Sequence, residues 1–230
     1  MTRRKAYDYS GFTLSRITEP RFSHLLLLSG WLFYFAAYFL TENLIPAEAC
    51  HPVHCFVDDL IPFNEFFVVF YIGWYFLVAG ALAYTLFYNV PRFKELQIFL
   101  IITQAVGIIW YIVWPNRQDL RPDVFLHQNI FTDLLSIIYT CDTPTCVCPS
   151  LHVAFTIGVM SVGLKDEDLP KPWKAFLCLC AVLISLTVCF VKQHSFVDVI
   201  AALPVCLLAE IIVFGRSYWL PRIKKSPPAG

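Results

Sequence analysis

The sequence lacks an excess of charge of either sign. Lysine and arginine together number 17, aspartate and glutamate also number 17, and the formal net charge at pH 7 is zero. Proteins that bind nucleic acids normally carry a basic surface. The charge balance therefore gives no reason to expect a nucleic acid partner.

The sequence also lacks the marks of a cleaved leader, of repeats and of linkers. No small-residue cleavage site follows the first apolar run, which continues to Thr41-Glu42-Asn43, so we expect a retained helix. Without an internal repeat or a long linker, residues 1–230 are interpreted as a single membrane domain. Its parts are a cytoplasmic N-terminal segment (1–21), a six-helix core (22–218) and a cytoplasmic tail (219–230).

Hydrophobic residues, in contrast, make up 58% of the chain, and the mean hydropathy is +0.62. Soluble domains have about 45–50% apolar residues. Because a helix needs about 20 apolar residues to cross a hydrocarbon core of roughly 30 Å, we predict an all-α fold, a polytopic bundle of six transmembrane helices. The predicted helices are 22–44, 66–88, 98–114, 151–164, 173–191 and 195–218. The fourth would span only ~21 Å, so its start is expected below the membrane surface.

The lysines and arginines predict which side of the membrane each connection faces, because cytoplasmic loops retain them. Most of them fall on the side of the two chain ends, which we therefore place in the cytoplasm: Arg3, Arg4, Lys5, Arg16, Arg21, Arg92, Lys94, Lys165, Lys171, Lys174, Arg216, Arg222, Lys224 and Lys225. The opposite, extracytoplasmic side has Arg117, Arg121 and Lys192.

Polar residues gather in three segments of that outer side, namely 116–122, 146–155 and 192–198. Ionisable groups at membrane depth are costly, so a functional interpretation is the default. His194 and Asp198 are four residues apart and would share one face of a helix. The carboxylate can hold one imidazole nitrogen as N–H and leave the other free as a nucleophile. The alternative is an ordinary His–Asp hydrogen bond that tethers the helix end.

The other two outer segments offer groups suited to a phosphate. Ser150 is a natural N-cap, and the unpaired N–H groups of a helix start attract anions. His152 in the first turn could protonate a leaving oxygen, or could simply face lipid headgroups. Arg121 has a guanidinium that fits phosphate bidentately. Arg117 could assist it or remain a solvated loop charge.

Together these residues resemble the motifs of the type 2 phosphatidic acid phosphatase and haloperoxidase superfamily of membrane enzymes. The match lies at Arg121-Pro122, Pro149-Ser150, His152, His194 and Asp198. The resemblance implies a six-helix core without a metal or another cofactor. It also implies that His194 is the nucleophile that forms a phosphohistidine, that Asp198 orients it, and that His152 protonates the leaving group. Arg121 and Ser150 would hold phosphate oxygens.

The chain departs from the family pattern at three places. Trp114 stands at the position of the family lysine, Leu151 replaces a glycine, and Thr187-Val188 replaces a Ser-Arg pair. We hypothesise that Lys192 partly replaces the missing arginine as a phosphate-binding residue. The forms Pro-Ser-Leu-His and Lys-Gln-His are also similar to a subgroup that includes inositol phosphorylceramide synthases and sphingomyelin synthases, which move a phospho-headgroup to another lipid alcohol.

The cysteines divide into two groups. Five are predicted to face the oxidising outer side, where we expect at least one disulfide with undetermined partners: Cys50, Cys55, Cys141, Cys146 and Cys148. The cluster Cys50-His51-Pro52-Val53-His54-Cys55 could alternatively bind zinc. Four lie in apolar runs and are interpreted as small hydrophobic packing residues: Cys178, Cys180, Cys189 and Cys206.

The sequence thus predicts an integral membrane lipid phosphatase that hydrolyses a lipid-linked phosphate ester at the outer leaflet through a phosphohistidine. A lipid phosphotransferase is the first alternative, since water and an alcohol attack such an intermediate in the same way. A non-catalytic membrane scaffold is the second. The expected partners are a lipid phosphate and the membrane.

Overall fold

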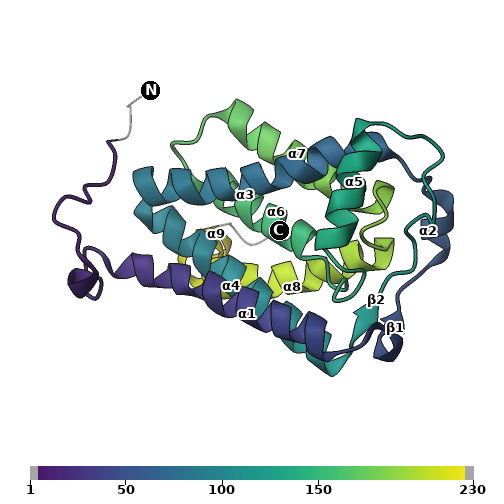
Figure 1. Ribbon diagram of the computed structural model, residues 1–230. Coiled ribbons are helices and arrows are strands. Elements are labelled where there is room, and N and C mark those ends of the chain that lie inside the picture. The colour runs from purple at the N-terminus through teal and green to yellow at the C-terminus, as the bar shows by residue number, and fades with distance from the viewer. Residues whose placement is uncertain (1–4, 226–230) are drawn as a thin grey trace.

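The computed structural model describes residues 5–225, which form an almost entirely helical protein with 71% helix and 2% strand (Figure 1). In chain order the elements are η1 (Leu14–Arg16), η2 (Ser23–Leu28), α1 (Ser29–Leu44), η3 (Ala47–Ala49), β1 (His51–Pro52), α2 (Phe56–Leu60), η4 (Glu65–Phe67), α3 (Val68–Tyr88), α4 (Val90–Val113), β2 (Asn116–Arg117), α5 (Ile130–Cys141), α6 (Leu151–Lys165), α7 (Lys171–Phe190), α8 (Phe196–Phe214), η5 (Gly215–Trp219) and α9 (Leu220–Lys225). The all-α prediction is confirmed.

Five helices in the described part of the chain are long and apolar enough to cross a membrane, which is typical of an integral membrane protein. They are Ser23–Leu44, Glu65–Tyr88, Val90–Val113, Lys171–Phe190 and Phe196–Lys224. The prediction had six. The remaining helix, α6, has 15 residues and would span about 22 Å. It is short because Ser150 caps its start and Asp166 follows its end.

Helix α6 lies in the middle of the bundle, against α7, α4, α8 and α3. Most of its residues are buried, so its neighbours in this structure are other helices. A Cβ on Gly158 would come within 2.7 Å of the Phe99 ring on α4. The glycine therefore allows α4 and α6 to approach closely, and α6 is held as the packed centre of the fold.

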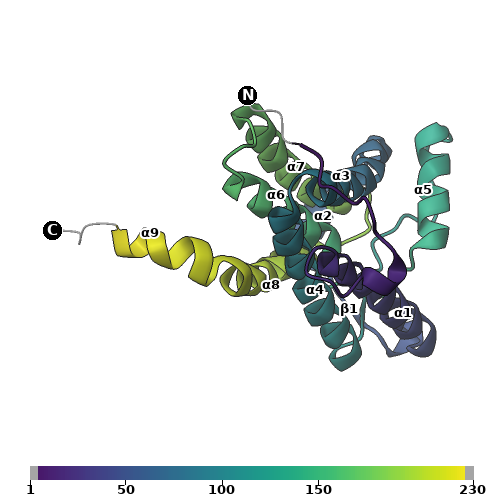
Figure 2. The same ribbon diagram turned by 90° about the vertical axis from the view of Figure 1, so that its left-hand side faces the viewer.

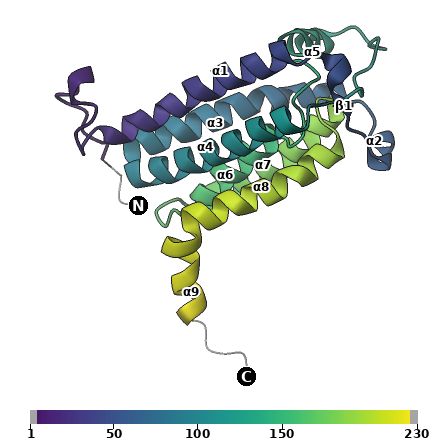
Figure 3. The ribbon, with the colours of Figure 1, turned by 90° about the horizontal axis from the view of Figure 1, so that it is seen from below.

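Two helix boundaries differ from the prediction. Helix α4 begins at Val90 instead of residue 98, because Asn89 caps it and Pro91 occupies its first turn. The last helix passes through a π-helical turn at Gly215–Trp219, after which α9 turns away from the bundle (Figure 3). Neither difference affects the end of the bundle that carries the candidate site.

The irregular elements gather at one end of the bundle, where β1, α2 and α5 lie close to one another (Figure 3). Helix α5, which the apolar-length criterion did not predict, stands beside the bundle (Figure 2). Strand β1 pairs in parallel with β2. The buried amide of Asn116 on β2 accepts hydrogen bonds from the N–H groups of Val147 and Cys148 and donates to the Cys148 carbonyl. Asn116 thereby fixes the loop that leads into α6.

Candidate active site

The imidazoles of His152 and His194 meet at this end of the bundle. His152 lies in the first turn of α6, and His194 lies in the turn before α8. Nδ1 of His152 is 3.2 Å from Nε2 of His194, and the ring centroids are 5.3 Å apart. Two histidines 42 positions apart in the sequence thus form one hydrogen-bonded pair.

Asp198 lies on the far side of His194 from His152. Its Oδ2 is 3.1 Å from Nδ1 of His194 and also accepts a hydrogen bond from the Ser195 N–H. Because a carboxylate only accepts, Nδ1 of His194 carries the proton and its Nε2 keeps a lone pair. Nδ1 of His152 then donates to that lone pair. The arrangement is a relay in which Asp198 orients His194 and His194 faces His152.

The turn before α8 is built locally. Lys192 has a φ of 53°, in the left-handed region, and the N–H groups of Gln193 and His194 both donate to the Val188 carbonyl. Ser195 then caps α8 in a capping box with Asp198. The carboxylate that orients the histidine therefore also holds the helix start, which keeps the His194 ring in place relative to α8.

His152 is held on the opposite side by aromatic residues of α3. Its ring centroid lies 4.3 Å from that of Trp74 and 4.8 Å from that of Tyr71. Its carbonyl accepts hydrogen bonds from Nε1 of Trp74 and from the Thr156 hydroxyl. Nε2 of His152 is buried and has no hydrogen-bond partner among the described residues. The ring nitrogen of His152 that faces His194 is Nδ1.

Asp58 on α2 is a supporting residue that the sequence analysis missed. Its Oδ2 accepts from the Ser195 hydroxyl at 2.6 Å and its Oδ1 from the Phe196 N–H at 2.7 Å, so it sits on the start of α8. Burial would raise the pKa of this carboxyl, but the hydrogen bonds from Ser195, Phe196 and Cys55 outweigh burial and lower the pKa below its usual value. The signal in the sequence was weak, because the Asp58-Asp59 pair in a short connecting segment gives no indication of a distant partner.

We expect Asp58→Asn to destabilise the protein by about 2 kcal/mol, because an amide cannot accept all of these charge-assisted hydrogen bonds. Since folding lowers the pKa of Asp58, its contribution is present above about pH 4 and is lost as the pH falls through the folded-state pKa. Thermal unfolding in detergent at pH 7 measures the loss. Asp59→Asn is the matched control, because Asp59 is exposed and its carboxylate pairs with the exposed His54 at 2.8 Å. Equal melting temperatures for the two variants would contradict the prediction.

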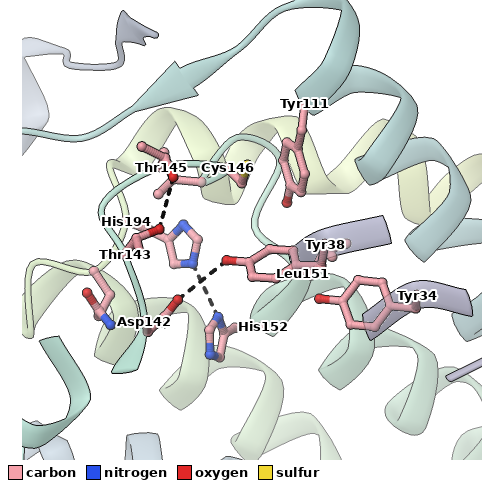
Figure 4. A pocket seen from close by; sticks show the side chains of 12 residues that line it. Tyr34, Tyr38, Tyr111, Asp142, Thr143, Thr145, Cys146, Leu151, His152 and His194 are labelled. Atoms are coloured by element: carbon pink, nitrogen blue, oxygen red, sulfur yellow. Dashed lines mark hydrogen bonds between the residues drawn. The ribbon is translucent and has the colours of Figure 1, made fainter. Parts of the chain in front are cut away.

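The histidine pair opens onto a cavity of about 40 Å³, room for about three water molecules. Figure 4 shows tyrosines of α1 and α4 on one side of it and the histidines with the 142–147 loop on the other. The lining residues are Tyr34, Tyr38, Tyr111, Asp142, Thr143, Thr145, Cys146, Val147, Leu151, His152, Gln193 and His194. The sequence analysis did not predict these tyrosines, because they lie in apolar segments that were interpreted as membrane helices. It did not predict Asp142 either, because that residue lies at the end of a helix, α5, that was not predicted.

Arg121, Ser150 and Lys192 do not line this cavity. Arg121 donates to the carbonyls of Tyr139 and Asp142 and to the side chain of Gln193. Burial lowers the pKa of its guanidinium, while the nearby Asp142 opposes that change. Nε of Arg121 is buried without a partner among the described residues. Through Gln193, Arg121 is one side chain away from the cavity.

The side chains of Ser150 and Lys192 form hydrogen bonds with backbone groups. The Ser150 hydroxyl accepts from the Val153 N–H as the cap of α6, and the Ser150 N–H donates to the Asp198 carbonyl. The ammonium of Lys192 donates to the carbonyls of Asp58 and Ile61. Its aliphatic stem and charge therefore point toward α2, and its phosphate-binding role stays a prediction, as do those of Ser150 and Arg121.

The positions at which this chain differs from the family motif, Trp114 and Val188, do not supply a cation to the cavity. Trp114, at the end of α4, stacks on His51 with ring centroids 5.8 Å apart. Val188 is fully buried in α7 and offers its carbonyl to the turn at His194. No Lys or Arg therefore stands among the described residues that line the cavity.

All nine cysteines are free thiols, so the expected disulfide among the five outer cysteines does not form in this structure. Burial raises the pKa of Cys146 and Cys148 to about 12, and both are therefore neutral thiols at pH 7. Cys141 is exposed at the end of α5. Of the cysteines predicted as packing residues, Cys189 and Cys206 are buried, and Cys178 and Cys180 are half-buried.

The zinc alternative for residues 50–55 also finds no support in the geometry. His54 contacts Asp59, His51 stacks on Trp114, and Sγ of Cys50 lies 3.6 Å from the Pro46 carbonyl. Within residues 5–225, no three histidine, cysteine, aspartate or glutamate side chains converge as a metal site would require.

Comparisons of the chain with family models, with curated proteins and with solved structures gave no match. The functional argument therefore depends on the residues and their geometry.

Proposed function

We propose that this protein is an integral membrane phosphoryl-transfer enzyme, a lipid phosphatase that acts through a phosphohistidine on His194. The observation that carries the proposal is the relay from Asp198 through His194 to His152, which opens onto a cavity. The resemblance to the type 2 phosphatidic acid phosphatase and haloperoxidase superfamily supports the same assignment. Helix α6 would be the sixth, short span of that family's core.

The proposed reaction has two steps. Nε2 of His194 attacks phosphorus and the P–O bond to the lipid alcohol breaks. His152, in the imidazolium form that a bound phosphate anion favours, gives one proton to the departing oxygen and is left as neutral imidazole. Water then attacks phosphorus, its proton passes to His152, and the P–N bond breaks to release phosphate. In both steps Asp198 stabilises the charge that develops on the His194 ring.

The two histidines contact each other directly when no substrate lies between them. At 3.2 Å the donor nitrogen of His152 occupies the direction of the His194 lone pair, where phosphorus has to approach. A substrate phosphate must therefore separate the two rings and insert between them. His152 then remains on the side of the departing oxygen, as a general acid requires.

The distribution of basic residues supports an outer location for the site. Arg92 on α4 donates to the Lys165 carbonyl at the end of α6, and Lys165 pairs with Glu210 on α8 at 2.6 Å. Basic residues thus cluster at the end of the bundle opposite the histidine pair. Since cytoplasmic ends are rich in lysine and arginine, we assign the histidine pair to the extracytoplasmic side and both chain ends to the cytoplasm.

Transfer to a lipid alcohol is a second candidate, and one observation favours it. The described cavity lining holds no Lys or Arg, whereas a phosphomonoester dianion calls for cationic partners. A diester, with a single negative charge, is less demanding. An alcohol in place of water in the second step would then produce a new phospholipid.

The test is to trap the intermediate in purified protein in lipid nanodiscs. Brief incubation with labelled phospholipids, followed by rapid denaturation at alkaline pH and mass spectrometry, should find the phosphoryl group on His194. Released phosphate supports hydrolysis, whereas a new phospholipid made with ceramide or diacylglycerol supports transfer. A chain with neither adduct nor product across monoester and diester lipids would refute both enzyme assignments and favour the non-catalytic scaffold.

A further inference from the structure

Helix α8 ends in a bend at the end of the bundle opposite the histidine pair. The helix has 19 residues and is about 28 Å long, close to the roughly 30 Å thickness of a hydrocarbon core. Its start follows the turn that holds His194, and the π-helical turn Gly215–Trp219 comes directly after its end. A membrane around the bundle would therefore have its polar boundary at this bend.

Helix α9 continues from the bend across the direction of α8, and Figures 2 and 3 both show it away from the other helices. A helix with that direction lies along a membrane surface. On the inner side of the bend is a groove of about 570 Å³, which we call the elbow groove. Its apolar walls are Leu207 and Ile211 on α8 and Leu220 and Ile223 on α9, and Arg216 lines it between them.

A buried ion pair holds the bend in shape. The ammonium of Lys165 on α6 lies 2.6 Å from Oε1 of Glu210, and Nε1 of Trp219 donates to the same oxygen at 2.6 Å. The ammonium also lies 4.3 Å from the centroid of the Phe214 ring. Glu210 lines the elbow groove, but Lys165 compensates its charge. The groove is therefore preformed, and its one carboxylate among the described residues is neutralised.

The charge at the groove is positive. Arg216 is exposed, and its guanidinium forms no hydrogen bond or ion pair with another residue of the described range 5–225. Residues 211–230 contain four basic residues and no aspartate or glutamate: Arg216, Arg222, Lys224 and Lys225. A basic segment beside a membrane attracts the anionic lipids of the cytoplasmic leaflet.

We infer that the elbow groove binds one anionic phospholipid of the cytoplasmic leaflet, with the lipid phosphate at Arg216 and an acyl chain between α8 and α9. The apolar walls match the chain, and the guanidinium matches the phosphate. A second copy of the protein fits less well, because a symmetric contact through this groove would bring two Arg216 side chains together.

This inference goes beyond the proposed function. The elbow groove lies past the end of α8, whereas the histidine pair lies before its start. The lipid bound there is therefore not the substrate. The inference uses the proposed placement of the chain ends in the cytoplasm, and it does not depend on the phosphohistidine.

The test is native mass spectrometry of the full chain released from detergent, which counts bound lipids. Dioleoyl phosphatidylglycerol and dioleoyl phosphatidylcholine compare an anionic with a zwitterionic headgroup on the same acyl chains. We expect the first phosphatidylglycerol to bind at least about fivefold more tightly, the contribution of roughly one basic residue at a membrane surface. Equal affinities for the two lipids would overturn the inference.

A charge variant locates the headgroup. Arg216→Gln should weaken phosphatidylglycerol binding about fivefold and leave phosphatidylcholine binding unchanged. Lys94→Gln is the matched control, because Lys94 is an exposed lysine in the first turn of α4, at the same end of the bundle, and does not line the groove. It should leave both affinities unchanged. Unchanged binding in Arg216→Gln, or equal losses in the two variants, would contradict a site at Arg216.

A second variant blocks the apolar wall and keeps every charge. Ile211→Trp should fill the elbow groove and remove the tightly bound phosphatidylglycerol. Ile212→Trp is its control, because Ile212 is equally exposed and does not line the groove. Lipid binding that survives Ile211→Trp would show a diffuse attraction and refute the groove. A dimer that only Ile211→Trp dissociates would assign the groove to a second copy instead.

The lipid site and the proposed function fail separately. A phosphoryl adduct on His194 without any preference for phosphatidylglycerol would refute the lipid site alone. A preference that Arg216→Gln removes, in a chain that forms no adduct, would refute the phosphohistidine alone.

Discussion

His194→Ala should lower turnover of the lipid substrate at least about 10³-fold, because the change removes the nucleophile and with it the covalent step. Folding should be little affected, since His194 makes its side-chain hydrogen bonds to His152 and Asp198, and the turn around it is held by backbone bonds and the Ser195 cap. Product formation in nanodiscs, with the melting temperature measured in parallel, checks both statements.

The matched control is His54→Ala. His54 is an exposed histidine of the same end of the molecule whose ring contacts the exposed Asp59. Its loss should leave turnover within about twofold, a change of a few tenths of a kcal/mol in activation free energy. Full activity in a folded His194→Ala protein would contradict the enzyme proposal and favour the non-catalytic scaffold.

His152→Gln should lower turnover of a natural lipid about 10²- to 10⁴-fold, the usual contribution of a general acid. A lipid alkoxide is a poor leaving group and needs the proton, whereas nitrophenolate does not. The same variant should therefore lose less than about tenfold with a nitrophenyl phosphate ester. Initial rates with the two substrates, measured on one preparation, give the comparison.

The contrast between the substrates separates proton donation from positioning. His152 also packs on Trp74 and Tyr71, so a loss of activity could also come from a disturbed cavity. A disturbed cavity would slow both substrates equally. Equal losses would thus contradict the general-acid role and assign His152 to positioning His194 through their hydrogen bond.

The segments that form the long helices were predictable from the sequence, because helix formation in an apolar run depends on residues close together in the chain. Apolar runs of about 20 residues give long helices wherever they occur. Breakers and caps at Asn89, Pro149 and Ser150 explain where α4 and α6 begin. The amphipathic α5 escaped prediction because it is too short for the length criterion, although Asn129 and Thr132 form a capping box at its start.

The candidate site was predictable only in part. The short spacing of His194 and Asp198 predicted their contact, although His194 lies just before the Ser195 cap of α8 and does not share a helix face with Asp198. The positions of the cations were not predictable in this way. Lys192 is adjacent in sequence to the site, but its ammonium lies on the carbonyls of Asp58 and Ile61, because a long flexible side chain goes to whichever acceptors the fold brings near it.

The amino-acid sequence by itself determined the helical, membrane-typical character of the chain and the pairing of His194 with Asp198, since both depend on residues close together along the backbone. The tertiary structure alone decided that α6 is the buried centre, that His152 meets His194, and that Asp58 supports α8. It also decided that Asp142 and the tyrosines share the cavity of the histidines. These contacts join residues far apart in the chain, and only the packing of whole helices sets such distances.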